Sequence, residues 1–246
     1  MYPELFKLGP VTIYSYGLFV ALGFLAASLV SGYLAKKAGL SAEKIMDLNI
    51  YSFLAAVLGA RILYIFTELD YYLQYPDQIW KIWEGGLVFY GGLITGLIFF
   101  FWYTRHNKLD PLKTADLLVP GVALGQAFGR IGCFFRGCCY GVKSESFGMV
   151  FPDIKDGLPH VPTQLIESAA TLCIFIFLMR RKPKFNGEHF VLYLILYASA
   201  RFLIEFIRAD ERGAKIFGLL SVSQFLSLLF AVPAVFLYSR RRLKNP

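Results

Sequence analysis

The sequence has few charged residues. Asp, Glu, Lys and Arg make up 17% of its 246 residues, against about 25% in soluble domains. Hydrophobic residues make up 57%, where soluble domains have about 45–50%. Because the apolar residues come in blocks, the composition excludes an ordinary soluble enzyme and predicts a protein that spans a membrane.

Cysteine is also scarce, and repeats and low-complexity segments are absent from the sequence. Four cysteines are too few for a disulfide-built scaffold, and the apolar composition excludes disorder, collagen and a coiled coil. The net charge of +8 is compatible with nucleic-acid binding, but the basic residues flank the apolar blocks. We therefore predict a membrane partner and no nucleic acid.

Seven apolar blocks predict seven transmembrane helices in a single domain, residues 1–246. The first block is too long for a signal-peptide core and has no basic start, so we expect it to be retained. A lone chain with this periodicity cannot close a barrel, which makes the expected fold all-α. The predicted spans are Leu8–Ala35, Asp47–Phe66, Gly85–Tyr103, Ala115–Phe135, Pro162–Met179, Phe190–Ile207 and Ile216–Tyr238.

The loop charges predict the orientation of the chain. Lys and Arg are more numerous in the loops after the first, third and fifth spans and in the tail after Tyr238 than on the opposite side. Cytoplasmic loops carry the excess of Lys and Arg. We therefore expect the N-terminus outside the cell and the C-terminus in the cytoplasm.

Two of the charged residues inside predicted spans are expected to be structural. A charged side chain at the centre of a span costs at least about 2.5–3.5 kcal/mol, so each one needs a partner or a function. For Arg61 and Asp116 we favour pairing that holds helices together. The glycines Gly121, Gly125 and Gly129 similarly favour close helix packing.

Three other arginines suggest a ligand. Arg130, Arg201 and Arg208 lie near the outward ends of their spans, at the depth of a phospholipid headgroup, and a guanidinium matches a phosphate with two hydrogen bonds. Arg201, Glu205 and Arg208 share one helix face. Arg201 and Glu205 can also simply pair with each other. We expect a lipid-phosphate site here rather than a purely structural network.

The chain also resembles a known family. Residues 129–141 read GRIGCFFRGCCYG, which resembles the signature G-R-x-G-N-F-x-x-x-E-x-x-G of bacterial prolipoprotein diacylglyceryl transferases. Residues 85–94 (GGLVFYGGLI), 162–167 (PTQLIE) and 197–208 (YASARFLIEFIR) are similar to further motifs of that family, as is the segment from Leu8-Gly9-Pro10 to Tyr16-Gly17-Leu18. The order and spacing of these motifs match along nearly the whole chain.

The resemblance implies an activity and a location. The family transfers diacylglycerol from phosphatidylglycerol to the lipobox cysteine of an exported prolipoprotein, releasing glycerol 1-phosphate, without a metal or other cofactor. The partners would be the lipid bilayer, phosphatidylglycerol and the prolipoprotein signal peptide. The enzyme would lie in the bacterial cytoplasmic (inner) membrane with its site toward the outer, periplasmic side.

The resemblance also assigns roles to individual residues. Arg201, Glu205, Arg208 and Tyr90 would be catalytic, and Arg130 would bind the lipid headgroup. The remaining residues expected to bind substrate are Tyr16, Cys133, Cys138, Glu167 and Tyr197.

Three of these positions depart from the family pattern. Tyr90 stands where the family has histidine, Cys133 replaces its asparagine and Cys138 its glutamate. Histidine is the natural base for a thiol at neutral pH, whereas a tyrosine pKa is about 10. Three interpretations stay open: arginines lower the pKa of Tyr90, Glu205 is the base, or Tyr90 only hydrogen-bonds the lipid.

The cysteines allow several roles. Thiols beside arginines are more nucleophilic, so one of Cys133, Cys138 and Cys139 could accept a group covalently, two could form a disulfide on the outer face, or all three could only pack a helix end. The spacing C-x4-C-C matches no standard zinc pattern, so no metal site is expected. We expect Cys173 in the core.

The three histidines lie in predicted loops and are expected on the solvated surface. They are His106, His160 and His189. His160, in the long outward loop Arg136–Val161, is the one that we place nearest a site.

Two alternatives to the transferase function remain. The departures at Tyr90 and Cys138 are compatible with a lipid-modifying transferase that uses a different acceptor. They are also compatible with a non-catalytic protein that binds or transports phospholipid. A thiol-redox role is a more distant hypothesis.

Overall fold

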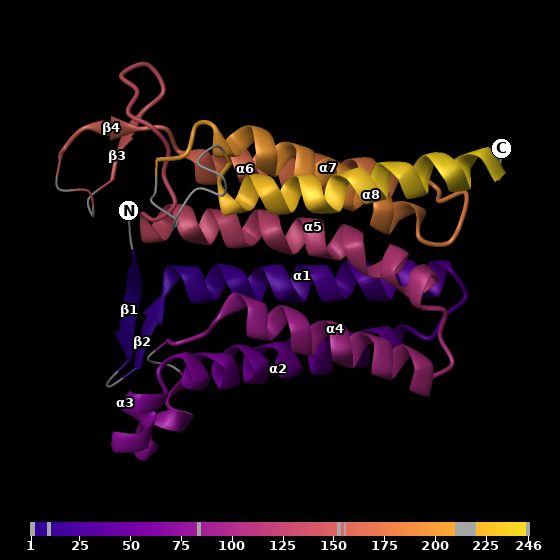
Figure 1. Cartoon of the computed structure of the whole chain (residues 1–246), viewed down its shortest axis with the longest axis horizontal. Coiled ribbons are helices and arrows are strands. Elements are labelled where there is room, and N and C mark those ends of the chain that lie inside the picture. Colours follow the sequence, from indigo (N-terminus) through magenta and orange to yellow (C-terminus); the bar gives the residue numbers. More distant parts are fainter. Residues whose placement is uncertain are drawn as a thin grey trace. The chain divides into compact units, whose positions relative to one another are not determined.

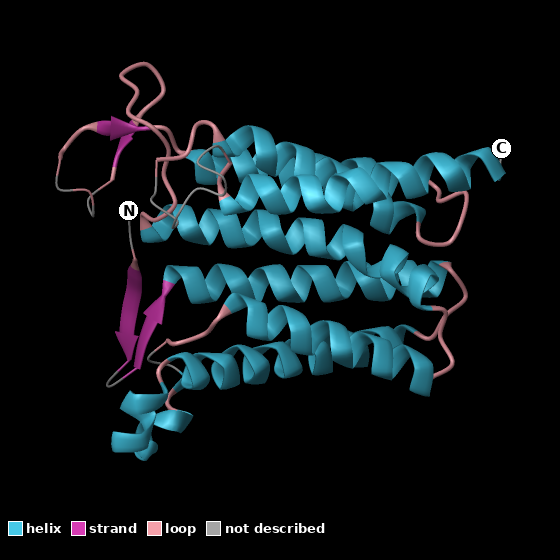
Figure 2. Cartoon of the chain, in the orientation of Figure 1, coloured by secondary structure: helices cyan, strands magenta, loops and turns pink. Residues whose placement is uncertain are grey.

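The computed structural model describes residues 3–8, 11–82, 85–151, 154, 156–209 and 220–244. Most of them are helical, and two short antiparallel ribbons complete the secondary structure (Figure 2). The chain divides into two compact units. The middle unit is Gly32–Thr114, and the terminal unit combines Met1–Ser31 with Ala115–Pro246. The single domain expected from the sequence stays a prediction.

Seven helices of at least 18 residues lie within the described part of the chain (Figure 1). Five of them, α1, α2, α5, α6 and α8, are long and apolar enough to cross a membrane. The other two long helices, α4 and α7, are less apolar. Helix α4 ends on Arg105 and His106, and α7 contains Arg201 and Glu205. The bounds are α1 Ser15–Lys37, α2 Ala42–Thr67, α4 Phe89–His106, α5 Pro111–Arg136, α6 Thr163–Arg180, α7 Glu188–Glu205 and α8 Val222–Lys244.

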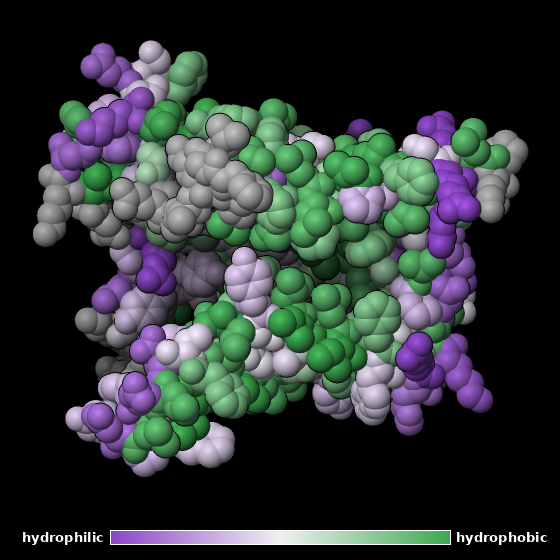
Figure 3. Space-filling view, viewed as in Figure 1, coloured by the Kyte–Doolittle hydropathy of each residue, from purple (hydrophilic) through white to green (hydrophobic). Residues whose placement is uncertain are grey.

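Large apolar side chains lie on the outer faces of these helices. Leu58, Phe66 and Leu203 are each more than 60% exposed, and Figure 3 shows apolar surface along the helices with hydrophilic residues near their ends. A water-soluble protein does not expose apolar surface of this extent. The exposed faces therefore agree with a multi-pass membrane protein.

The all-α prediction misses two ribbons. Strand β1, Glu4–Leu8, pairs with β2, Val11–Tyr14, so the predicted span Leu8–Ala35 is wrong at its start and helix α1 begins at Ser15. The β-branched residues of Val11–Tyr14 favour a strand over a helix. In the long outward loop, β3 (Met149–Val150) pairs with β4 (Pro159–His160).

Some sequence predictions fall outside the described residues. Gly9 and Pro10 of the N-terminal motif are among them, as is Ile216, the expected start of the last span.

In the middle unit, helices α2 and α4 pack through glycines. A Cβ on Gly91 would collide with the carbonyl oxygen of Gly59, and one on Gly92 would lie 2.9 Å from the carbonyl oxygen of Ala56. Thr95 Oγ1 donates a hydrogen bond across the contact to the Ala55 carbonyl (3.0 Å). This close approach is typical of small-residue helix contacts in membranes.

Arg61 of α2 holds the segment between these two helices, which contains α3 (Leu69–Gln74) and the 3-10 helix η1 (Pro76–Trp80). Its guanidinium is buried and donates to the carbonyl oxygens of Gln78 (2.7 Å), Ile79 (3.0 Å) and Gly85 (2.7 Å). These contacts are backbone contacts that fix a loop. They agree with the structural role expected for Arg61.

In the terminal unit, α1 and α5 also approach through small residues. A Cβ on Gly121 would lie 2.6 Å from the Ala27 carbonyl oxygen, and one on Gly125 would lie 3.3 Å from that of Gly23. A Cβ on Gly129 would meet no atom of the described residues within 4 Å, so the packing role expected for Gly129 is wrong. Gly129 directly precedes Arg130, so this free space lies next to the start of that residue.

Helices α5, α6 and α7 enclose a small core, and α7 also packs on α8 (Figure 1). Asp116 of α5 accepts hydrogen bonds from the backbone N–H groups of Gly187 (2.7 Å) and Phe190 (2.9 Å), at the start of α7. A carboxylate satisfies the unpaired N–H groups of a helix N-terminus. Asp116 is therefore structural, as expected. The core residues are Val119, Ala123, Ile174, Leu178 and Tyr193.

Candidate functional site

Three elements of the terminal unit bring five charged side chains together. Arg130 comes from the last two turns of α5, Glu167 from the second turn of α6, and Arg201 and Glu205 from the end of α7, while Arg208 follows α7. We call these five residues the arginine–glutamate cluster. All five were expected at the site from the sequence, and the fold brings them into one network of ion pairs.

Glu167 is the centre of this network. Its Oε1 lies 2.8 Å from Arg130 Nη2, and its Oε2 lies 3.5 Å from Arg208 Nη1 and 4.0 Å from Arg201 Nη1. The side chain is only 3% exposed. A buried carboxylate is stable when cations surround it, so Glu167 fixes three guanidinium groups relative to one another.

Glu205 forms the second anchor. Its Oε2 lies 2.7 Å from Arg201 Nη2, four residues earlier on α7, and 3.9 Å from Arg208 Nε. Arg201 Nη2 also donates to Ser223 Oγ of α8 (3.1 Å). Backbone pairing of Val142 N–H with the Ile207 carbonyl (2.9 Å) joins the end of α7 to the loop after α5. The contact with Ser223 was missed by the sequence analysis, because no motif includes that residue.

The three arginines are part of one ion-pair network, and the expected pair of Arg201 with Glu205 is present in it. Each has a carboxylate partner, because Glu167 contacts all three. Three guanidinium groups nevertheless face two carboxylates, which leaves the cluster cationic. Arg201 and Arg208 side chains are 8% and 3% exposed, whereas Arg130 is 21% exposed. Arg130 is therefore the member of the cluster most accessible to an anionic ligand.

Arg201 retains hydrogen-bonding capacity. Its Nη1 is buried and makes no hydrogen bond with any residue that the structure describes. A buried donor without an acceptor is costly, and an anion supplied by a ligand would satisfy it. This geometry fits a site that is completed by substrate.

Two tyrosines lie beside the cluster. Tyr197 of α7 interacts electrostatically with Arg130 and Glu167 and stacks on Tyr193 with ring centroids 5.7 Å apart. Tyr16 of α1 packs on α5, since a Cβ on Gly132 would lie 3.3 Å from its ring. The roles expected for Tyr16 and Tyr197 at the site stay predictions.

The three cysteines at the end of α5 form a compact group. The Sγ atoms of Cys133, Cys138 and Cys139 all lie within 4.8 Å of one another, and none of the four cysteines forms a disulfide. The loop is held by α6, where Thr163 Oγ1 and Gln164 Nε2 donate to the Cys139 and Cys138 carbonyls (both 2.6 Å). The sequence analysis missed these two hydrogen bonds, although Thr163 and Gln164 belong to the PTQLIE motif.

Other predicted residues lie elsewhere. Tyr90 is the second residue of α4 in the middle unit, where it is half exposed and contacts Phe89 (ring centroids 5.7 Å apart), so its part in the site stays a prediction. Cys173 is exposed rather than in the core, because helix α6 has apolar residues on its exposed face as well as on its buried face. An apolar run in a membrane helix does not distinguish the two sides.

The histidines also differ from expectation. His160 and His189 are buried, and only His106 is exposed, stacked on Trp102. His160 contacts the Gly141 carbonyl through Nδ1 (2.9 Å) and Asp156 through Nε2 (3.2 Å). It thus joins two parts of the outward loop.

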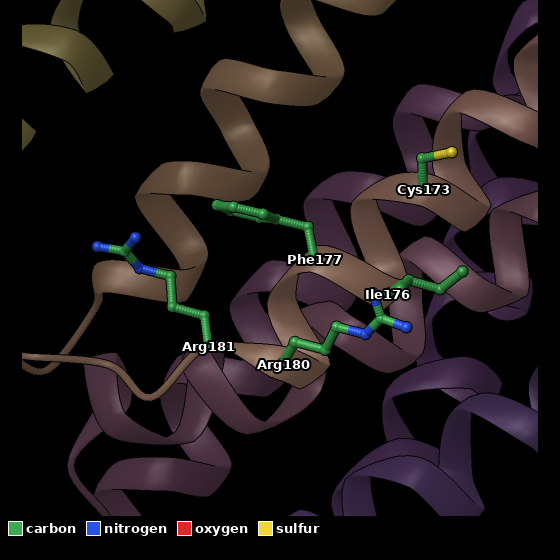
Figure 4. A pocket seen from close by; sticks show the side chains of 5 residues that line it. All are labelled: Cys173, Ile176, Phe177, Arg180 and Arg181. Carbon is green, nitrogen blue, oxygen red and sulfur yellow. The ribbon is translucent and has the colours of Figure 1, made fainter.

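A separate depression of about 450 Å³ lies at the other end of α6 (Figure 4). Its lining residues are Cys173, Ile176, Phe177, Arg180 and Arg181. Arg181 is already paired with Glu188 Oε1 at 2.7 Å, and Glu188 holds its pKa above the usual value. Because all five lining residues come from one helix end, the depression has the form of a surface groove.

Fold and cluster together define a multi-pass membrane protein with a buried arginine–glutamate site. The family model of prolipoprotein diacylglyceryl transferases matches residues 3–240, and the chain belongs to this family. It is 38% identical to phosphatidylglycerol–prolipoprotein diacylglyceryl transferase 2 of Clostridium perfringens, over 95% of this chain and 93% of that protein. The corresponding transferase of Clostridium tetani is 37% identical over the full length of both chains. That of Streptococcus equi subsp. zooepidemicus is 37% identical over 99% of this chain and 96% of the relative.

Proposed function

We infer that this protein transfers the diacylglyceryl group of phosphatidylglycerol to the cysteine thiol of a prolipoprotein. The names of the full-length relatives support the reaction. The observation in the structure that carries it is the cationic cluster around Glu167, with Arg130 as its accessible member. An anionic phospholipid headgroup is the ligand that this charge and this membrane setting favour.

The reaction places specific demands on the site. A sulfur–carbon bond forms at the glycerol carbon of the lipid while the bond from that carbon to the phosphate oxygen breaks. The thiol loses its proton, and glycerol 1-phosphate leaves with one more negative charge than the phosphodiester had. Guanidinium groups that are already oriented in a dry site stabilise this developing charge without reorganisation.

The residues divide these tasks. Arg130 binds the phosphate, and Arg201 Nη1 and Arg208 stabilise the leaving group, while Glu167 and Glu205 keep the guanidinium groups in place. Tyr16 and Tyr197 orient the lipid beside Arg130, and Cys133 and Cys138 line the same region of the site. Either Tyr90 or Glu205 accepts the proton of the peptide thiol. If Glu205 accepts it, Tyr90 hydrogen-bonds the lipid.

The topology belongs to the same proposal. Seven spans with the N-terminus outside and the C-terminal arginines in the cytoplasm follow from the loop charges. This orientation puts the cluster near the outer, periplasmic face of the bacterial cytoplasmic membrane, where an exported lipobox peptide arrives. The further partners are therefore the signal peptide and the surrounding bilayer.

A reconstituted assay tests the reaction. Purified protein in phosphatidylglycerol vesicles is given a lipobox peptide, and mass spectrometry follows the peptide while glycerol phosphate is measured in solution. We expect a diacylglyceryl thioether and equimolar glycerol phosphate. A peptide with serine in place of the lipobox cysteine and vesicles of phosphatidylcholine are the matched controls. Glycerol phosphate without a modified peptide would indicate another acceptor, and lipid binding without either product would indicate a non-catalytic protein.

A further inference from the structure

The cysteine group at the end of α5 has no chemical step assigned to it in the reaction described above, although Cys133 and Cys138 line the site. Cys133 lies in the last turn of α5, and Cys138 and Cys139 directly follow that helix. We call the three residues the cysteine trio. Cys138 and Cys139 Sγ are 3.6 Å apart, and no two of the three Sγ atoms are more than 4.8 Å apart.

The backbone is held in an unusual conformation to produce this arrangement. Gly137 ends the helix with φ 85°, and the N–H of Cys138 donates back to the Cys133 carbonyl (3.2 Å). Cys139 then has φ 70°, a left-handed conformation that is rare for a residue with a Cβ. Such strain persists only where the surroundings enforce it, and it is concentrated at functional sites.

The surroundings that enforce it come from α6. Thr163 is fully buried and Gln164 is 1% exposed, and their side chains donate the two short hydrogen bonds to the trio's carbonyls. Glu167 lies one turn further along the same helix. One rigid element therefore positions both the trio and the centre of the arginine–glutamate cluster.

The sulfur positions are compatible with a shared metal ion. Three thiolates around a zinc ion, each at about 2.3 Å, have sulfurs about 3.8–4.0 Å apart, which lies within the range set by 3.6 and 4.8 Å. Thiolates are also the ligands that select zinc and copper(I) over harder ions.

We propose that Cys133, Cys138 and Cys139 bind one zinc ion through three thiolates and leave its fourth position open to the thiol of the acceptor peptide. Three protein ligands with an open position are typical of catalytic rather than structural zinc. The spacing C-x4-C-C did not predict this site, because the Cys139 thiol reaches the other two only when the backbone of Cys139 is left-handed. The part concerning the peptide thiol rests on the proposed function.

The position of the trio suits that role. Arg130 lies one turn before Cys133 on α5. A thiol that coordinates zinc gives its proton to solvent, and the resulting thiolate can attack the glycerol carbon while the phosphate leaves toward Arg130. Binding of zinc itself releases the protons of the three protein thiols. This coordination would replace the histidine base that the chain lacks at Tyr90.

Metal stoichiometry tests the site without any substrate. The full-length protein, purified in detergent with a non-thiol reductant, is equilibrated with zinc and its bound metal is measured by mass spectrometry. We expect about one zinc per chain, lost in Cys133→Ser, Cys138→Ser and Cys139→Ser. The control Cys173→Ser changes the exposed cysteine of α6 and should keep the metal. Wild-type protein that binds no zinc, or trio variants that bind as much as the control, would overturn the proposal.

Cobalt substitution tests the open position. Cobalt(II) in the wild-type site should show sulfur-to-metal absorption, and a lipobox peptide should change this spectrum while its serine analogue does not. An unchanged spectrum with the cysteine peptide would overturn the fourth-ligand assignment. If the spectrum responds but no thioether forms in lipid vesicles, the zinc site stands and the transferase function fails. Gel filtration of each variant establishes that loss of metal is not loss of folding.

Discussion

At the residue scale, Arg130 differs from the other members of the arginine–glutamate cluster. Its guanidinium is the most exposed of the three, although Glu167 already neutralises one side of it. The space beside Gly129 is open with respect to the described residues, so a ligand can approach the backbone just before Arg130. In the proposed reaction, the buried arginines hold the phosphate charge that develops, and Arg130 selects the lipid.

Arg130→Gln should therefore remove most of the activity and leave the fold intact. Loss of one oriented donor to a developing anion costs about 100-fold or more in rate, and Arg130→Lys should recover only part of it because Lys cannot bind with two parallel donors. The measurement is kcat/KM for lipid in the vesicle assay. Arg180→Gln, at the exposed end of α6, is the matched control. Equal activity of the two glutamine variants would contradict the role of Arg130.

The sequence predicted that these charged residues lie together and that Arg201 can pair with Glu205, but it did not predict the central position of Glu167. Charges inside apolar spans identify Arg130, Glu167 and Arg201 because their burial is costly. That Glu167 contacts three arginines depends on how α6 packs against α7, which no local pattern encodes. The close approach of the three cysteine thiols was likewise not predicted, because the position of the Cys139 thiol depends on the φ angle of that residue.

At the scale of elements, glycines determine how closely α2 and α4 approach. Gly91→Ala should destabilise the protein by about 1–3 kcal/mol, because the added methyl collides with the Gly59 backbone and overpacks the contact. Gly96→Ala, on the same helix, adds its methyl 3.7 Å from Ala56 Cβ and should be tolerated. Thermal unfolding in detergent compares the two. A midpoint for Gly91→Ala equal to that of Gly96→Ala would show that the contact is looser than described.

The outward loop provides a pH-dependent prediction. The Leu158 N–H (3.0 Å) and Lys143 Nζ (2.9 Å) hold the pKa of Asp156 at about 2, below the usual value of about 3.9. The ionised carboxylate therefore stabilises the loop above about pH 4, and this contribution is lost as the pH falls toward 2.

Pepsin cleavage in residues 142–161 measures this effect. Asp156→Asn should be cleaved faster than wild type at pH 4, and the ratio of the two rates should approach one near pH 2. Glu145→Gln removes an exposed carboxylate from the same loop and should match wild type throughout. A constant ratio for Asp156→Asn across this range would exclude a stabilising role of the Asp156 carboxylate.

The helices were predicted better than the strands. Apolar blocks predicted all seven long helices, five of them to within five residues at each end, because a span of about 20 apolar residues is a strong signal. The ribbon of β1 and β2 was absorbed into the first span, since Val11–Tyr14 is apolar whether it is helical or extended. The four residues of β3 and β4 carry too little pattern to be recognised.

At the scale of the whole molecule, the proposed orientation makes a labelling prediction. In cells, a membrane-impermeant maleimide should label Glu145→Cys without permeabilisation, because the loop 137–161 faces outward. Lys36→Cys, at an exposed position in the last turn of α1, should be labelled only after the membrane is opened. Labelling of each variant is compared with that of the parent chain, which has the same native cysteines. The reverse pattern would invert the topology and place the cluster toward the cytoplasm.

The most direct test of the account is where the lipid phosphate binds. An experimental structure of the protein in phosphatidylglycerol nanodiscs should show the headgroup phosphate within hydrogen-bonding distance of the Arg130 guanidinium, beside the buried arginines. If Arg130 instead contacts only Glu167 and the phosphate lies away from the cluster, the arginines form a packing network and the assignment of the site is wrong.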